Sequence, residues 1–274
     1  MILVVHSNRD IAGVNIGEIV LQNYPFTKTE NNYQENPTYK AEIKGKQVNF
    51  IILNQEAVNA QYLQKDFPNV ELIVFLSKHS SQSGKPTLSV HTPGNFALAG
   101  LGGLPRTLSV APAGAMQTVL KTMIRFKQEM NLNYDVSYEC THHGPSLNIP
   151  TMFTELGSSE TQWQDSMAAH VVADSAIAAI ENFPGKTKSA VLGIGGTHYN
   201  EKFTRMALAG DALFGHMIPK YAISTIDSEM LTQCIQKTLE TVSLALLDWK
   251  GIASQDKPKL LSALAEANLP FKKV

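Results

Sequence analysis

The feature that most constrains the fold of this 274-residue chain is an alternation of two kinds of segment. Short apolar runs rich in β-branched residues alternate with longer segments whose apolar residues recur with a helical period. This alternation is typical of a parallel sheet covered by helices. We therefore expect an α/β fold with a mixed, mostly parallel sheet flanked by helices. No linker divides the chain, so we expect a single domain over residues 1–274.

The apolar runs and the helical periods set the expected elements. Strands are predicted at Met1–His6, Val48–Leu53, Leu72–Leu76, Leu88–His91, Leu108–Ala111, Asp135–Glu139, Met152–Glu155, Ala190–Ile194 and Tyr221–Thr225. Helices are predicted after Pro112, from Asp165 to Pro184-Gly185, and from Asp227 or Ser228 to a point before Gly251. The polar segment Thr27–Lys46 predicts a long loop or an edge hairpin.

Charge and composition limit the compartment and the partners. Lys+Arg 23 against Asp+Glu 24 gives a net charge of −1, so no global field draws the chain to nucleic acid or anionic lipid. No apolar run approaches the ~20 residues of a membrane span, and the run Met1–Val5 is too short for the apolar core that a secretory signal is expected to have. Cys140 and Cys234 lack the spacing of a disulfide scaffold or a metal knuckle. We expect a soluble cytoplasmic protein with no membrane partner.

Polar side chains collect where the predicted strands end. They are His6, His79, His91, His142, His143, Glu155 and His198. The carboxyl ends of parallel strands line the ligand crevice of an open α/β sheet, so these groups are expected to converge. One strand-end histidine is usually just a satisfied hydrogen-bond partner, but six of the eight histidines fall here.

The sharpest local feature is Cys140-Thr141-His142-His143-Gly144-Pro145. Neutral imidazoles are common zinc ligands, but adjacent histidines diverge in a regular strand, so the loop must bend for both to face one ion. The alternative is that one histidine binds a metal while the other donates a structural hydrogen bond. Cys140 can be read as an activated nucleophile or as a buried, inert thiol.

Several longer motifs carry a resemblance to a known family. They are Phe75–Ser81 with Gly84–Pro86, Leu88–Asn95, Glu139–Pro145, Glu155–Glu160 with Trp163, and Gly215–Tyr221. Together they resemble the archaeal and plant type of D-aminoacyl-tRNA deacylase, and the resemblance runs essentially end to end. It implies hydrolysis of the ester between a D-amino acid and tRNA, an association with zinc, and a phosphorylase/peptidyl-tRNA hydrolase-like fold.

Chemistry and position then suggest roles for the candidate residues. We expect His79 and Glu155 to be catalytic and His142, His143 and His198 to bind zinc, with Glu155 as general base or as a partner of a zinc ligand. The expected substrate-binding residues are Lys78, Ser80, His91, Thr92, Gly94, Asn95 and Tyr199. Candidates to grip the tRNA are Lys78, Lys85, Arg106 and Lys220. No obligate protein partner is implied.

Other mechanisms and functions stay open on the sequence. A metal-free mechanism would use a histidine to position water and loop amides to hold the oxyanion. A small-molecule hydrolase or a nucleoside phosphorylase-like enzyme can use the same fold. An RNA-binding module without catalysis would bind tRNA and cleave no ester.

Overall fold

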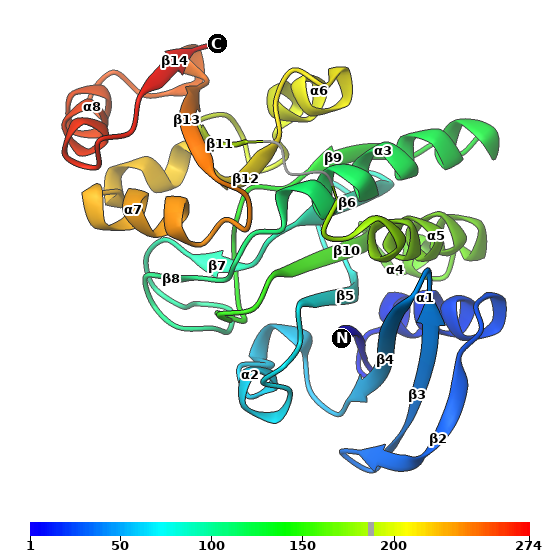
Figure 1. Ribbon diagram of the computed structural model, residues 1–274. Helices are drawn as coiled ribbons and strands as arrows, with labels where there is room; N and C mark the ends of the chain where they lie inside the picture. The colour runs from blue at the N-terminus through cyan, green and yellow to red at the C-terminus, as the bar shows by residue number, and fades with distance from the viewer. Residues whose placement is uncertain (186–188) are drawn as a thin grey trace.

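Two sheets dominate the described part of the chain, residues 1–185 and 189–274 of a computed structural model (Figure 1). The larger sheet has the spatial order β2 (Thr27–Tyr33), β3 (Asn36–Ile43), β4 (Lys46–Leu53), β1 (Ile2–Ser7), β5 (Leu72–Lys78), β10 (Thr151–Gly157), β6 (Thr87–His91) and β9 (Asp135–Tyr138). The smaller sheet has the order β12 (Phe214–Ile218), β11 (Ala190–Ile194), β13 (Val242–Leu247) and β14 (Phe271–Lys273). Strands β7 (Gly94–Asn95) and β8 (Thr107–Leu108) form a short separate ladder.

Strand directions confirm the mixed, mostly parallel α/β fold. In the larger sheet β1 runs parallel to β4 and β5, and β10 runs parallel to β5, while the hairpin strands and the β10–β6 pair are antiparallel. The paired strands of the smaller sheet are parallel throughout. The carboxyl ends of β5 and β10 therefore lie at one edge, where the sequence places polar residues.

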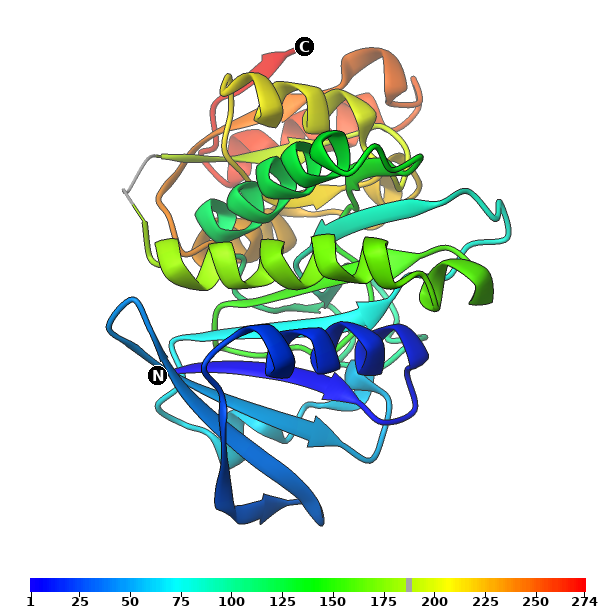
Figure 2. The same cartoon turned by 90° about the vertical axis from the view of Figure 1, so that its right-hand side faces the viewer.

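Helices cover the sheets. They are α1 (Ile11–Asn23), α2 (Leu63–Asp66), α3 (Ala113–Glu129), α4 (Glu160–Trp163), α5 (Ser166–Asn182), α6 (Glu201–Ala209), α7 (Ser228–Gln236) and α8 (Lys257–Glu266), with short 3₁₀ turns η1 (Ala57–Asn59), η2 (Lys220–Thr225) and η3 (Trp249–Gly251). Helices α1, α5 and α3 lie side by side in the row that faces the viewer in Figure 2. Asp10, Asp165 and Asp227 cap their helices by accepting backbone hydrogen bonds, and the sequence predicts helix starts near Asp165 and at Asp227 or Ser228.

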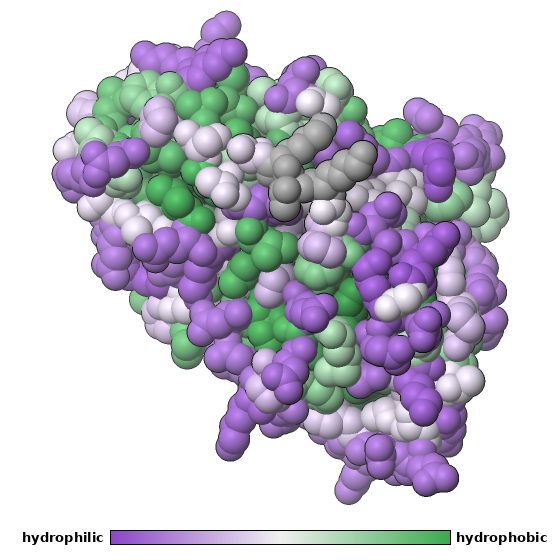
Figure 3. Space-filling model, viewed as in Figure 1, coloured by the Kyte–Doolittle hydropathy of each residue, from purple (hydrophilic) through white to green (hydrophobic). Residues whose placement is uncertain are grey.

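The two sheets share a hydrophobic core. The main cluster contains Val74 and Met152 of the larger sheet together with Phe214, Met217 and Leu246 of the smaller one. On the face shown in Figure 3, polar side chains dominate around the β2–β3 hairpin, whereas apolar side chains gather nearer the middle. Among the described residues, no helix is long and apolar enough to span a membrane.

The predicted strand Tyr221–Thr225 is wrong. This segment is the 3₁₀ turn η2, and the strand of this region is β12, Phe214–Ile218. Pro219 follows β12 directly and has no N–H to donate to a ladder, so the strand ends before it. Gly215 interrupts the apolar run of β12, so the sequence pattern of this strand is weak. A larger residue does not fit there, because a Cβ atom at position 215 would lie 2.6 Å from the side chain of Thr238.

The predicted long helix after Asp227 is also wrong in extent. Helix α7 ends at Gln236, and Val242–Leu247 form strand β13, which pairs with β11. The apolar residues there fit a helical period, but pairing with a buried parallel strand overrides that pattern. The predicted strand Leu108–Ala111 shrinks to β8, and Thr27–Lys46 forms the edge hairpin rather than a long loop.

Candidate active site

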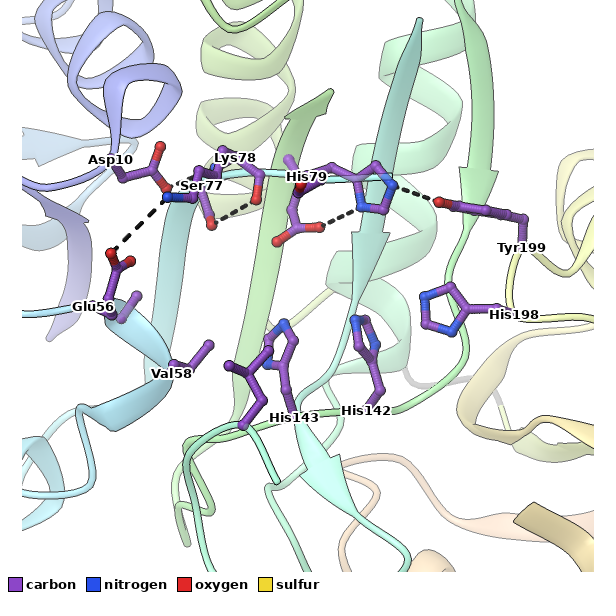
Figure 4. A pocket seen from close by; sticks show the side chains of 14 residues that line it. Asp10, Glu56, Val58, Ser77, Lys78, His79, His142, His143, His198 and Tyr199 are labelled. Atoms are coloured by element: carbon purple, nitrogen blue, oxygen red, sulfur yellow. Dashed lines mark hydrogen bonds and ion pairs between the residues drawn. The ribbon is translucent and has the colours of Figure 1, made fainter. Parts of the chain in front are cut away.

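A pocket of about 580 Å³ opens where the ends of β5 and β10 meet the loops that follow β9 and β11 (Figure 4). Its walls include His79, His142, His143, Glu155, His198 and Tyr199. These residues come from four separate stretches of sequence, which the fold brings together at the carboxyl ends of the strands. The expected convergence of strand-end groups is therefore confirmed for this set.

His79 occupies the centre of a buried acidic cluster. Its Nδ1 atom lies 3.0 Å from Oε1 of Glu139 and 3.5 Å from Oε2 of Glu155. Its Nε2 atom lies 2.6 Å from the hydroxyl of Tyr199. The indole N–H of Trp163 donates to the backbone carbonyl of His79 at 2.8 Å. The ring of His79 is thus held from several sides.

The carboxylates and the imidazole of this cluster each stabilise the charged form of the other. Burial alone would lower the pKa of His79, but the carboxylates of Glu139 and Glu155 outweigh it and raise that pKa to about 11. Burial would raise the pKa of Glu139, but His198 and His79 hold it well below its ordinary value. The pKa of Glu155 is also lowered, because His79 and His91 outweigh burial and the neighbouring carboxylate. At neutral pH the cluster therefore contains a protonated imidazole between two carboxylates.

Three further histidines form what we call the imidazole cluster: His91, His142 and His143. The ring nitrogens that could bind a metal lie within 4.8 Å of one another. Each Nδ1 atom faces a backbone carbonyl, at 3.3 Å for His91, 2.9 Å for His142 and 2.7 Å for His143. Donation from Nδ1 leaves the Nε2 lone pair free for a metal ion.

Burial gives two of these rings, His142 and His143, the protonation state that a metal needs. Burial lowers the pKa of His143 to about 4, and burial with the neighbouring His91 and His143 holds the pKa of His142 well below its ordinary value. His91 is fully buried, and Glu155, whose Oε1 lies 3.7 Å from Nε2 of His91, outweighs burial and raises the pKa of this ring. Its Nε2 atom makes no hydrogen bond among the described residues. An orphaned buried nitrogen beside two neutral imidazoles fits a zinc site.

The backbone of the loop explains how two adjacent histidines face the same pocket. His143 has a φ of +42°, in the left-handed region that few residues with a Cβ adopt. This bend brings the ring centroids of His142 and His143 to 4.3 Å from each other. The predicted bend of the loop is confirmed.

Comparisons with known proteins bear on what this site does. Residues 66–272 match the family model described as D-aminoacyl-tRNA deacylase. The chain is 35% identical to the D-aminoacyl-tRNA deacylase of Thermococcus kodakarensis over 99% of both chains, and 34% identical to that of Pyrococcus abyssi over 96% of both. The chain belongs to the D-aminoacyl-tRNA deacylase family. A crystal structure titled as a conserved protein of unknown function is 28% identical with a TM-score of 0.88, covering 100% of this chain and 95% of that one.

This member of the deacylase family does not bring every predicted substrate-binding residue to the pocket. Lys78, Ser80 and Tyr199 line it. His91 lies beneath it and joins the imidazole cluster instead. The remaining three hold loops in place: the Thr92 hydroxyl donates to the carbonyl of Thr151, Gly94 N–H donates to that of His143, and the Asn95 amide donates to that of Gly102.

Two other candidates also lie outside the deacylase pocket. His6 packs its ring on Phe50 under α1, with a centroid distance of 5.5 Å. Cys140 is fully buried, and burial raises the pKa of its thiol to about 12, so the thiol stays protonated at neutral pH. The inert reading of Cys140 is the one that the structure favours.

Glu139 is the residue that the sequence patterns missed. Its carboxylate is 0% exposed and lies within 3.6 Å of nitrogens of His79, His142 and His198. The available signal was a lone acidic residue that continues a buried strand directly before the Cys140–Pro145 loop. A charge at such a position needs partners, and here the partners are histidines.

Proposed function

We propose that this chain hydrolyses the ester bond that joins a D-amino acid to the 3′ end of tRNA, releasing the amino acid and the tRNA. The observation that carries the proposal is the pair of buried carboxylates, Glu139 and Glu155, held around His79 at the pocket. The relatives match the chain over nearly its full length, and their names support the choice of substrate. A cytoplasmic location is part of the proposal, because aminoacyl-tRNA is used there.

We assign the general base to Glu155. Its carboxylate lines the pocket, is 3% exposed and has a lowered pKa, so it is ionised at neutral pH. It would take a proton from the water whose oxygen attacks the ester carbonyl carbon. The bond from that carbon to the ribose oxygen then breaks, and the ribose oxygen takes up the proton that Glu155 received from the water.

His79 and Tyr199 would stabilise the negative charge that develops on the ester. The protonated imidazole of His79 donates from Nε2 to the Tyr199 hydroxyl at 2.6 Å. The O–H of Tyr199 is then available to donate to the substrate oxygen in the pocket. Glu139 keeps His79 charged and oriented without reaching the substrate itself.

We also propose that the imidazole cluster binds zinc. His91, His142 and His143 would hold the ion through their Nε2 atoms, since their Nδ1 atoms face backbone carbonyls. His198, which the sequence suggests as a ligand, pairs with Glu139 at 2.8 Å, so we assign it to orientation of the acidic cluster. When bound, zinc would supply a Lewis acid that polarises the ester carbonyl.

The test is release of free amino acid from matched D- and L-aminoacyl-tRNA by the purified protein. We expect rapid release from the D substrate, little from the L substrate, and a loss of at least about 100-fold in Glu155→Gln. No release from either hand would contradict the proposed function and favour a small-molecule enzyme.

Zinc is tested separately by metal content and by chelation with zinc add-back. His142→Asn should lose the metal, whereas His170→Asn on α5, away from the pocket, should keep it. D-selective release by a protein that holds no metal, and that an effective chelator leaves unchanged, would refute zinc and keep the function.

A further inference from the structure

The rim of the pocket carries an exposed aromatic ring that the mechanism above does not use. Tyr221, at the start of η2, is 62% exposed, although its hydroxyl lies 3.3 Å from Nδ1 of His198. Contact with His198 fixes the phenol end while most of the side chain faces solvent. Unpaired nucleic-acid bases stack on such aromatic faces.

A second pocket, of about 350 Å³, lies beside this rim. It shares the loop that leads from β11 to His198, through Gly196 and Thr197. Three basic residues line it: Lys202, Arg205 and Lys220. The second pocket therefore starts next to the mouth of the active-site pocket and extends away from that mouth over α6.

The basic residues of this second pocket differ in how far they are engaged. Lys202 is paired with Asp248 and also donates to the carbonyl of Val274. Within residues 1–185 and 189–274, Arg205 and Lys220 make no ion pair. Glu201 is the other acidic residue of the lining, so three cations face two carboxylates and the pocket has a positive excess. Such an excess suits a phosphate.

The other basic candidates are less suited to hold an RNA strand outside the pocket. Arg106 is committed to Asp227 through two contacts of 2.9 and 2.7 Å. Lys78 lies inside the pocket, 4.0 Å from Glu56. Lys85 lines a different pocket beyond Tyr199, where Lys85 and Arg205 are balanced by Asp135 and Glu201.

We propose that the 3′-terminal base of the tRNA stacks on Tyr221 and that the phosphate before it lies against Lys220 and Arg205. This inference rests on the proposed function, since the ester to be cleaved is attached to that terminal nucleotide. The unpaired 3′ end would then leave the active site over the loop between β11 and α6. Lys85 would not contact it.

The test compares variants on D-aminoacyl-tRNA and on a D-aminoacyl ester of adenosine, which keeps the base but lacks the preceding phosphate. Tyr221→Ala should raise the half-saturating concentration of both substrates about tenfold, as expected for a lost base–aromatic stack. Tyr221→Phe keeps the ring and should stay near wild type. Equal losses in Tyr221→Ala and Tyr221→Phe would mean that Tyr221 acts through His198, and would overturn the stacking assignment.

The double variant Lys220→Ala/Arg205→Ala should raise the half-saturating concentration of the tRNA substrate about tenfold and weaken its salt dependence, with a much smaller effect on the adenosine ester. Lys121→Ala, a surface lysine on α3, is the matched control and should behave as wild type. If Lys85→Ala weakens tRNA binding and the double variant does not, the strand leaves by the other pocket and the inference is wrong.

Binding of uncharged tRNA to the same variants separates this inference from the proposed function. Its 3′ end is the product of the proposed reaction, so binding reports on the surface without any cleavage. A wild type that releases no amino acid refutes the function. If the wild type releases D-amino acid but every variant binds uncharged tRNA as tightly as the wild type, the proposed tRNA-binding surface is refuted.

Discussion

Nδ1 of His79 lies 3.0 Å from Oε1 of Glu139, a carboxylate that solvent does not reach. A buried carboxylate next to a protonated imidazole stabilises the charge of that ring, so removal of the negative charge of Glu139 lowers the pKa of His79 and leaves Glu155 as its one carboxylate partner among the described residues.

Glu139→Gln should therefore lower kcat at neutral pH by at least about 100-fold while the protein stays folded, because His79 loses the nearer of the two carboxylates that keep it protonated and oriented. Steady-state release of D-amino acid measures this effect. The matched control is Glu240→Gln, a buried glutamate away from the pocket whose oxygens accept from the N–H groups of Ala113 and Gly114. That variant should lose ~1 kcal/mol of unfolding free energy and keep its kcat. Equal kcat losses in both variants would contradict a specific role for Glu139.

Gly157→Ala should impair catalysis through His79. A Cβ atom at position 157 would lie 2.6 Å from Cβ of His79 and 2.7 Å from its carbonyl oxygen, so His79 would have to move. A displacement of about 1 Å at a reacting group costs on the order of 100-fold in rate. Gly100→Ala is the control and should change nothing, since no atom of the described residues lies within 4 Å of the added Cβ. Wild-type kcat in Gly157→Ala would show that His79 tolerates displacement.

The cysteines should be unreactive in the folded protein. Burial raises the pKa of Cys140 to about 12 and also raises that of Cys234, so neither forms thiolate at pH 7.5. Iodoacetamide should label neither cysteine until the protein is unfolded, as intact-mass measurement would report. Cys140→Ala should keep most of the activity. Stoichiometric labelling of Cys140 in the native protein, with loss of activity, would support Cys140 as a nucleophile and contradict this prediction.

His216 should make stability fall as the pH drops. This fully buried ring lies 3.0 Å from the Thr141 hydroxyl at Nδ1 and 2.9 Å from the Lys237 carbonyl at Nε2, a pattern that suits the neutral ring. Burial lowers its pKa from 6.5 to about 4. Below pH 6.5 the imidazole of the unfolded chain binds a proton, whereas the ring of the folded protein stays neutral until about pH 4. The contribution of His216 to the free energy of unfolding is therefore fully present above pH 6.5. It falls by about 3 kcal/mol as the pH drops to 4.

Urea unfolding between pH 7 and pH 4 measures this loss. His216→Gln should have a flatter curve, because it has no proton to take up, even if it starts less stable at pH 7. His170→Gln on α5 is the matched control and should keep the wild-type slope. Parallel curves for wild type and His216→Gln would exclude His216 as the source.

Elements with strong local signals could be predicted from the sequence, and elements set by distant partners could not. Strands such as β5 and β11 are long apolar runs, and Asp165 and Asp227 are plain helix caps. Strand β13 fits a helical period and is decided by its pairing with β11, which no local pattern reveals. The same holds within the site. His142 and His143 stand out in the sequence as an adjacent pair. The role of Glu139 depends on contacts with His198 and His79, which lie 59 and 60 residues away along the chain.

Glu139 also joins the two sheets. It ends the path of β9 in the larger sheet, while His198 follows β11 in the smaller one, and Cys140 N–H donates to the carbonyl of His198 at 2.9 Å. The larger sheet supplies both carboxylates of the acidic cluster, and the loop after β11 of the smaller sheet supplies His198 and Tyr199, which contact Glu139 and His79. Chimeras that exchange residues 189–274 between distant relatives should therefore be active only when the incoming β11 loop fits the resident Glu139, so the two halves are expected to be inherited, and to be engineered, as one unit.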